Sequence, residues 1–191
     1  MENHNYQNEK TLYEPSFEHD ACGIGAIVNI DGTKSYTVVD NALSIVEKLE
    51  HRAGKDASGE TGDGVGILLQ IPHEFFSEAA VNGEIVGSDG TSCTCLGDER
   101  DYGVGMFFLS SDSFMRNKTM KLFENLCQKE DLKFLGWRTV PIAEDVLGEK
   151  AHNCMPVIMQ CFVARPENCA KGIDFDRKLY ILRRHFEKSC S

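Results

Sequence analysis

The amino-acid sequence predicts a folded domain of the α+β class. Of its 191 residues, 41% are hydrophobic, 26% are charged and five are Pro, which is typical of a packed domain rather than a disordered chain. Segments with the apolar spacing of strands alternate with segments that have the 3.6-residue period of helices. No internal repeat, low-complexity run or strong linker interrupts this alternation.

Charge and composition also limit the partners that the protein can have. The formal net charge of -10 argues against nucleic acid and acidic membranes, since both attract a basic surface. Residues 65–71 form the richest apolar stretch, which is too short to span a bilayer, and residues 1–10 lack the apolar core of a secretion signal. Eight cysteines in a chain without such a signal favour free thiols. We expect a soluble, cytoplasmic protein.

The first third of the chain contains an irregular leader, a strand and a helix. Residues 1–21 are polar and form the leader, and residues 22–30 predict a strand that ends in the turn pair Asp31-Gly32. A helix is predicted from about Thr37, where Thr37 and Asp40 resemble a capping box. Its apolar stripe consists of Val38, Val39, Ala42, Leu43, Val46 and Leu49.

The rest of the chain predicts a run of shorter elements. Residues 65–71 are apolar on both faces, as an interior strand should be, and Pro72 can open a short helix. Residues 83–101 predict a surface loop or insertion. Further strands are predicted at 104–109, 134–140 and 157–163, and further helices at 113–129 and 175–188. The last helix runs into the end of the chain without a closing Gly or Pro, so we expect that the domain is cut there.

Cys22 is the first candidate for chemistry, because Gly23 and Gly25 follow it. Glycines let a backbone approach a ligand closely, since no Cβ stands in the way. A cysteine at the head of a strand, beside such a backbone, is well placed to attack a carbonyl carbon. A buried structural cysteine explains the same local pattern, and the pattern alone favours that interpretation.

His51 and Arg52, at the end of the predicted helix, are the second candidate. The planar guanidinium of Arg52 suits a substrate carboxylate, and His51 could act as a base. Two cations at the carboxyl end of a helix are also favourable in themselves, and spacing alone favours that reading.

Residues 61–66 form a Gly-rich segment that superficially resembles a phosphate-binding loop. No Lys-Ser/Thr pair follows, and a strand rather than a helix is predicted next, which argues strongly against a P-loop. We expect a tight turn that lets the following strand cross close to Cys22.

The other thiols do not predict a metal site. Cys93 and Cys95 have the wrong spacing for a zinc knuckle, and no second paired motif follows them. We therefore expect no metal ligands in this chain.

Several motifs occur in one order over most of the chain. They are LYEPSFEHDACGIG at 12–25, LEHR at 49–52, TGDGVGIL at 61–68, IPHEFF at 71–76, YGVGM at 102–106, GWRTVP at 136–141, MPV at 155–157 and RKLY at 177–180. Together they resemble the amino-terminal class II glutamine amidotransferase domain of the large subunit of the glutamate synthase family.

This resemblance implies a fold and a mechanism. The fold is the four-layer αββα sandwich of the N-terminal nucleophile hydrolases, here incomplete at the C-terminus, with residues 1–21 as a propeptide and 22–191 as a partial domain. Removal of the propeptide makes Cys22 the first residue, and its thiol attacks the side-chain amide of L-glutamine to give a glutamyl thioester and ammonia. The new α-amino group titrates near pH ~8 and can serve as the general base.

The resemblance also assigns roles to residues. Cys22 is the catalytic residue, and Arg52, Gly23, Asp63 and Gly64 bind the substrate or shape its site. His51 is structural, because the mechanism needs no histidine base. The family commonly has Gly directly after the arginine, whereas this chain has Ala53 and then Gly54.

Other parts of the family enzyme are expected outside this segment. The full-length enzyme uses FMN, an iron–sulfur cluster and NAD(P)H or ferredoxin, and none of these is expected within this segment. The Asn-Gly pair of the oxyanion hole and the groups that grip glutamine lie beyond the last residue. Since one lost oxyanion donor costs roughly 10² to 10³ in rate, we expect these 191 residues alone to be inactive.

Two alternatives of other classes remain. The chain could be a non-catalytic piece that needs a companion chain, or other glutamate synthase domains or subunits, to complete it. It could also be a cysteine peptidase that uses Cys22, His51 and Asp63. The peptidase hypothesis predicts that His51→Ala abolishes thiol reactivity, whereas an amidotransferase keeps near-normal reactivity.

Overall fold

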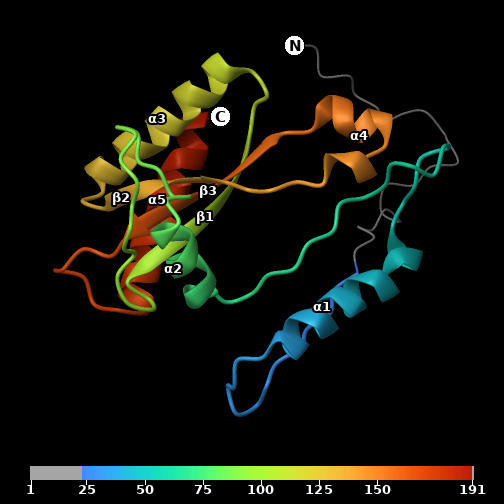
Figure 1. The fold of residues 1–191 in the computed structure, drawn as a ribbon, viewed down its shortest axis with the longest axis horizontal. Helices are drawn as coiled ribbons and strands as arrows, with labels where there is room; N and C mark the ends of the chain where they lie inside the picture. Colours follow the sequence, from blue (N-terminus) through green and yellow to red (C-terminus); the bar gives the residue numbers. More distant parts are fainter. Residues whose placement is uncertain (1–22, 191) are drawn as a thin grey trace, which may run out of the picture. The chain divides into compact units, whose positions relative to one another are not determined.

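A computed structural model describes residues 23–190 of the chain (Figure 1). The chain divides into two compact units, one ending at Leu69 and the other beginning at Gln70. None of the helices within residues 23–190 is both long and apolar enough to cross a membrane.

The first unit contains helix α1 (Tyr36–Lys48) and the 3₁₀ turn η2 (Glu50–Arg52). The predicted helix is confirmed, but the predicted capping box is wrong. Ser35 is the N-cap, and its hydroxyl accepts a hydrogen bond from the Thr37 amide at 3.2 Å. Ser35 has an extended backbone, which is the conformation of an N-cap, whereas Thr37 already lies inside the helix.

The two strands predicted in and next to the first unit are wrong. Residues 23–30 and 65–71 have no regular structure, although the turn at Gly32 is confirmed by its amide, which donates to the Asn29 carbonyl at 3.0 Å. A strand needs a partner for its backbone groups. Neither segment pairs with a strand among residues 23–190, and Ile24 and Leu68 are almost fully exposed.

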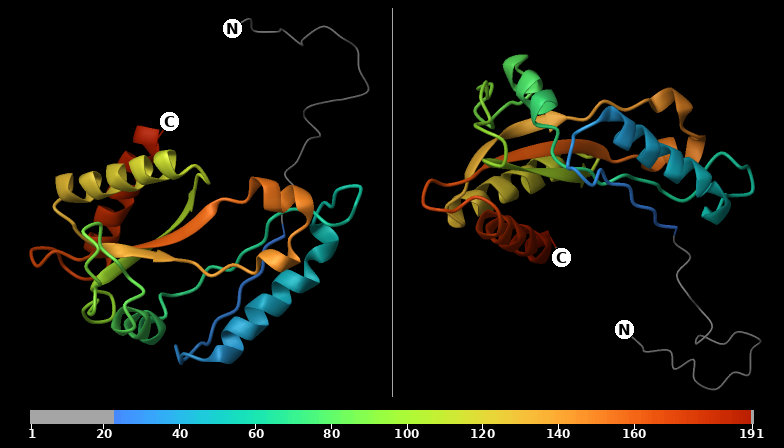
Figure 2. Two further views of the ribbon diagram at one scale, coloured as in Figure 1. Left: turned by 45° about the horizontal axis from the view of Figure 1, so that its top comes forward. Right: turned by 90° about the horizontal axis from the view of Figure 1, so that it is seen from below.

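The second unit is built on a three-stranded antiparallel sheet of order β1-β3-β2. Its strands are β1 (Tyr102–Leu109), β2 (Lys133–Thr139) and β3 (Val157–Ala164). Its helices are α2 (His73–Val81), α3 (Ser113–Lys129), the short α4 (Glu149–Cys154) and α5 (Ile173–Cys190), with a 3₁₀ turn η3 (Glu144–Val146) before α4. All three strands, α2, α3 and α5 were predicted, whereas α4 and η3 were not. Figure 2 shows α3 and α5 on one face of the sheet and α2 on the other.

Aromatic side chains fill the core between the sheet and helices α3 and α5. The ring of Phe107 from β1 lies 4.8 Å from that of Phe123, 5.0 Å from Trp137 and 5.3 Å from Phe186, all in edge-on contacts. Such offset contacts add to the hydrophobic stabilisation of a core. Because side chains alternate along a strand, Met106 and Phe108 point to the opposite face, where they are 50% and 68% exposed.

The predicted surface loop 83–101 is more than a loop. Its side chains Ile85 and Leu96 are buried under α2. Val86 forms two backbone hydrogen bonds with Trp137, both at 2.9 Å, and so covers one position on the outer edge of β2. The polar, Gly-rich composition of the segment does not indicate this role in the sequence, because only two apolar side chains, Ile85 and Leu96, hold the segment in place.

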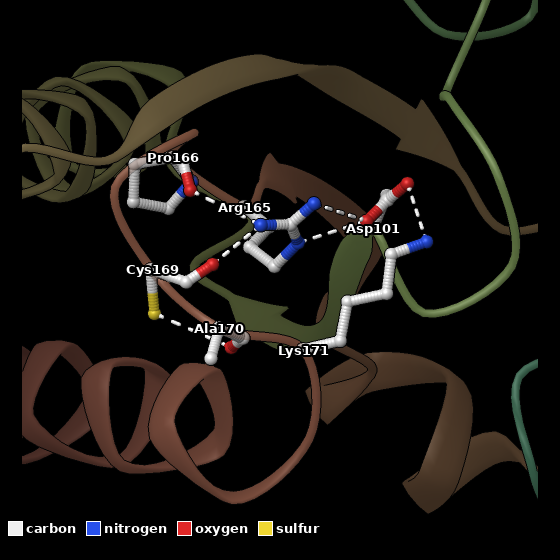
Figure 3. Close-up of polar contacts among 6 residues, drawn as sticks. All are labelled: Asp101, Arg165, Pro166, Cys169, Ala170 and Lys171. Atoms are coloured by element: carbon white, nitrogen blue, oxygen red, sulfur yellow. Dashed lines mark hydrogen bonds and ion pairs between the residues drawn. The ribbon is translucent and has the colours of Figure 1, made fainter.

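A polar cluster joins the beginning of β1 to the segment after β3 (Figure 3). The Asp101 carboxylate accepts from Arg165 Nε at 2.8 Å and pairs with Lys171 Nζ at 2.9 Å, while Arg165 Nη1 also donates to the Cys169 carbonyl. Hydrogen bonds from Lys171 and Arg165 hold the pKa of Asp101 below its usual value. These groups bond to one another, so the cluster has a structural role: it connects the beginning of β1 to the end of β3.

Candidate active site

The residues predicted to form the active site belong to the first unit. Cys22 lies outside the described residues, but its neighbours Gly23 and Gly25 lie within them. A Cβ on Gly23 would be 3.0 Å from the Leu49 side chain, and one on Gly25 would be 2.3 Å from Ile45 Cγ2. The segment after Cys22 therefore runs against the last two turns of α1, where Gly25 leaves no room for a side chain beside the branched Ile45 and Gly23 leaves little room beside Leu49. Ile45 was missing from the predicted apolar stripe, which included the exposed Leu43 instead.

Arg52 is held at the same end of α1. Leu49 caps the helix, and its carbonyl accepts the Arg52 amide at 2.8 Å, which closes the 3₁₀ turn η2. Leu49 thus contacts Gly23 through its side chain and Arg52 through its backbone. This shared contact brings the residue next to Cys22 and the base of Arg52 to one place, as the predicted site requires.

His51 contacts the helix rather than a second functional group. Its Nδ1 lies 2.9 Å from the Lys48 carbonyl oxygen, one of the acceptors left free at the end of α1. This contact fits the structural role expected for His51.

Asp63 belongs to a closed loop that starts just after Arg52. Its carboxylate Oδ2 accepts the Gly54 amide at 2.8 Å, and its own amide donates to the Gly54 carbonyl at 3.0 Å. Lys55 and Gly62 then form an antiparallel bridge. The tight turn predicted at 61–66 is wrong: the turn lies earlier, where the Gly59 amide donates to the Asp56 carbonyl at 3.0 Å, and residues 61–63 form the return arm of the loop. Around Gly64, a Cβ would meet no atom within 4 Å.

Two residues close to Arg52 in the sequence, Glu50 and Lys55, form an ion pair. Glu50 and Lys55 face each other across η2, and the hydrogen bond from Lys55, followed by its charge, lowers the pKa of Glu50. Both side chains are largely exposed, so this pair contributes little to stability.

The resemblance places the iron–sulfur cluster of the family outside this segment, and the donor set of the described residues can be compared with that expectation. Iron–sulfur clusters are commonly held by four Cys thiolates, and no group of three or more Cys, His, Asp or Glu side chains gathers within residues 23–190.

A comparison with known families shows the family to which the chain belongs. The family model of the class-II glutamine amidotransferases matches residues 22–191, so the match begins at Cys22. This chain belongs to the class-II glutamine amidotransferases. The family resemblance predicted from the sequence motifs is therefore confirmed, as is an α+β fold with helices and a small antiparallel sheet.

The relatives of this amidotransferase chain are glutamate synthases. It is 36% identical over 176 residues to the glutamate synthase [NADPH] large chain of Bacillus subtilis, covering 92% of this chain and 11% of that protein. It is 39% identical over 166 residues to ferredoxin-dependent glutamate synthase 2 of Synechocystis, covering 87% and 10%. The Arabidopsis thaliana ferredoxin-dependent glutamate synthase 1 is 36% identical over 172 residues, covering 90% and 10%. The amidotransferase chain thus spans about a tenth of the length of these curated relatives.

Proposed function

We propose that this chain supplies the nucleophile Cys22 to a glutamate synthase that hydrolyses L-glutamine and uses the ammonia for glutamate synthesis. The observation that carries the proposal is the position of Leu49, which contacts both Gly23, next to Cys22, and the base of Arg52. Membership of the class-II glutamine amidotransferases and similarity to glutamate synthases support the same reaction.

The reaction follows from the residues at this end of α1. Cleavage before Cys22 frees its α-amino group, which takes the thiol proton while the sulfur attacks the side-chain carbonyl of glutamine. The amine returns that proton to the departing nitrogen, so ammonia leaves and a glutamyl thioester remains. Water then cleaves the thioester to give glutamate and the free thiol. Arg52, whose donors suit a carboxylate, helps to position the substrate, Gly64 leaves open space around it, and Gly23 keeps the segment after Cys22 against Leu49.

The proposed fold is the four-layer αββα sandwich. In this arrangement, α3 and α5 form an outer helix layer on the β1-β3-β2 sheet. The exposed Met106 and Phe108 on the opposite face support a second layer there, because an apolar sheet face is stable only when it is covered.

We also propose that the ammonia is used elsewhere in a longer cytoplasmic protein. The relatives are about ten times longer than the stretch they share with this chain, and their names specify NADPH or ferredoxin as the electron donor. Any FMN or iron–sulfur cluster would belong to those other parts.

Mass spectrometry can test the proposed reaction. The intact mass of the purified protein should show that residues 1–21 are missing. A diazo-ketone analogue of glutamine should then label Cys22. Cys22→Ser should abolish both labelling and ammonia release, whereas Cys95→Ser, at an exposed thiol of the second unit, should change neither. His51→Ala should label normally, and loss of its labelling would favour the cysteine peptidase. A retained leader, or ammonia release that survives Cys22→Ser, would contradict the proposal.

A further inference from the structure

The loop that follows Arg52 is closed at its base by one acidic side chain. Gly54 and Asp63 exchange two hydrogen bonds, one to the Asp63 carboxylate at 2.8 Å and one between the backbones at 3.0 Å. The Asp56 amide continues the pairing by donating to the Thr61 carbonyl at 2.8 Å. The two arms of the loop are therefore joined from Gly54 to Asp63.

Arg52 lies between two anchors because of this closure. Its own amide is bound to the Leu49 carbonyl, and only Ala53, in an extended conformation, separates it from Gly54. The helix thus fixes the chain before Arg52, and Asp63 fixes it after. The loop contains Gly54, Gly59 and Gly62, which have wide conformational freedom, so an open loop would lose the backbone anchor that follows Arg52.

We propose that Asp63 is a positioning residue that holds Arg52 in place for the substrate by closing the 54–63 loop. This inference rests on the proposed function, and it replaces the substrate contact that the family resemblance implies for Asp63. The Asp63 carboxylate oxygen that accepts from the Gly54 amide keeps the loop closed. This role of Asp63 requires a hydrogen-bond acceptor but not a negative charge.

Gly62 supports this role independently of Asp63. A Cβ on Gly62 would lie 2.8 Å from the Gly54 carbonyl oxygen, a backbone atom that cannot move aside without opening the loop. Gly62→Ala should therefore cause the same defect as loss of the Asp63 side chain.

The test compares two labels of Cys22 in the full-length protein. The diazo-ketone analogue of glutamine needs Arg52 to hold it, whereas iodoacetamide needs only the thiol. Asp63→Ala and Gly62→Ala should slow the first reaction by up to about 10²-fold and leave the second unchanged. Asp63→Asn keeps an oxygen that accepts from Gly54, so it should label at the wild-type rate. A KM for glutamine that rises more than kcat falls should accompany Asp63→Ala.

A double mutant shows whether Asp63 acts through Arg52. In an Arg52→Ala background, Asp63→Ala should cause no further loss, because residues that act as one unit are not additive. Additive losses, or an Asp63→Asn variant as slow as Asp63→Ala, would overturn the inference and indicate a direct contact with the substrate. Wild-type protein that is labelled no faster than Asp63→Ala would also overturn it. Wild-type protein without any label on Cys22 would instead overturn the proposed function and this inference together.

Discussion

Arg138 is a charged side chain held inside the second unit. It is 8% exposed, and it donates from Nε to Glu84 at 2.8 Å and from Nη1 to Gln160 at 3.0 Å. Its guanidinium also lies 5.1 Å from the centre of the Phe75 ring. A buried charge is tolerated when it is paired in this way.

Replacing Arg138 should therefore destabilise the protein. We expect Arg138→Met to lower the free energy of unfolding by about 1–3 kcal/mol, because the buried Gln160 loses its donor. Urea denaturation followed by circular dichroism measures the change. Arg177→Met, which breaks the exposed pair with Asp174, is the matched control and should cost less than about 1 kcal/mol. Equal losses in the two variants would show that the buried contacts contribute nothing.

Glu124 makes the stability depend on pH. Burial raises its pKa, but hydrogen bonds from Ser88, Trp137 and Lys121 lower it by more, so the net pKa lies below the usual value. The folded protein thus binds fewer protons than the unfolded chain. The resulting stabilisation is complete above the unfolded pKa, about 4.3, and is lost as the pH falls through the folded pKa.

Glu124→Gln should remove this pH dependence. The urea midpoint of the wild-type protein should fall more steeply than that of the variant as the pH decreases below about 5. The fluorescence of Trp137, the only tryptophan, reports unfolding, since its indole donates to Glu124 at 3.0 Å. Parallel pH profiles would contradict this assignment.

Among the elements, strand β2 depends on a glycine for its contact with the 83–101 segment. The register of β2 shifts between Phe134 and Gly136, and a Cβ on Gly136 would lie 2.9 Å from the backbone of Val86. Backbone atoms in a paired segment cannot easily move, so this position excludes a side chain.

Gly136→Ala should accordingly weaken the second unit by about 1–3 kcal/mol. Gly103→Ala on β1 is the matched comparison, because its Cβ would meet the flexible end of Leu179 at 2.5 Å. Leu179 can rotate away, so we expect a smaller loss for this variant in urea denaturation. A Gly136→Ala variant that is as stable as wild type would show that Val86 does not pair with β2.

At the scale of the whole molecule, burial divides the thiols into inert and reactive groups. Cys127 and Cys161 lie in the core shared by the sheet, α3 and α5, whereas Cys95 and Cys154 are exposed. Burial, followed by the charge of Glu124, raises the pKa of Cys127 to about 12, and burial raises that of Cys161 as well.

A maleimide should distinguish these groups in the native protein. Cys95 and Cys154 should react, and Cys127 and Cys161 should react only after unfolding in urea, because the thiolate is the reactive form. Peptide mapping by mass spectrometry identifies the labelled sites. Native labelling of Cys127 at the rate of Cys95 would contradict the core described above.

The sequence by itself determined the four longest helices, the strands of the second unit and the family. Ser113–Lys129 matched its predicted bounds because helical periodicity is a local property, and the motifs around Cys22 and Arg52 identified the amidotransferase. The same patterns could not show which segments find partners. Residues 65–71 have the composition of a strand, but a strand depends on a partner from a distant part of the chain.

Only the tertiary structure decided what several individual residues do. Gly23 and Gly25 pack against α1, Val86 pairs with the edge of β2, and Asp63 closes the loop after Arg52. Each of these contacts joins residues that lie far apart in the sequence or have ordinary local patterns. Their roles depend on distances in space, which composition and periodicity do not contain.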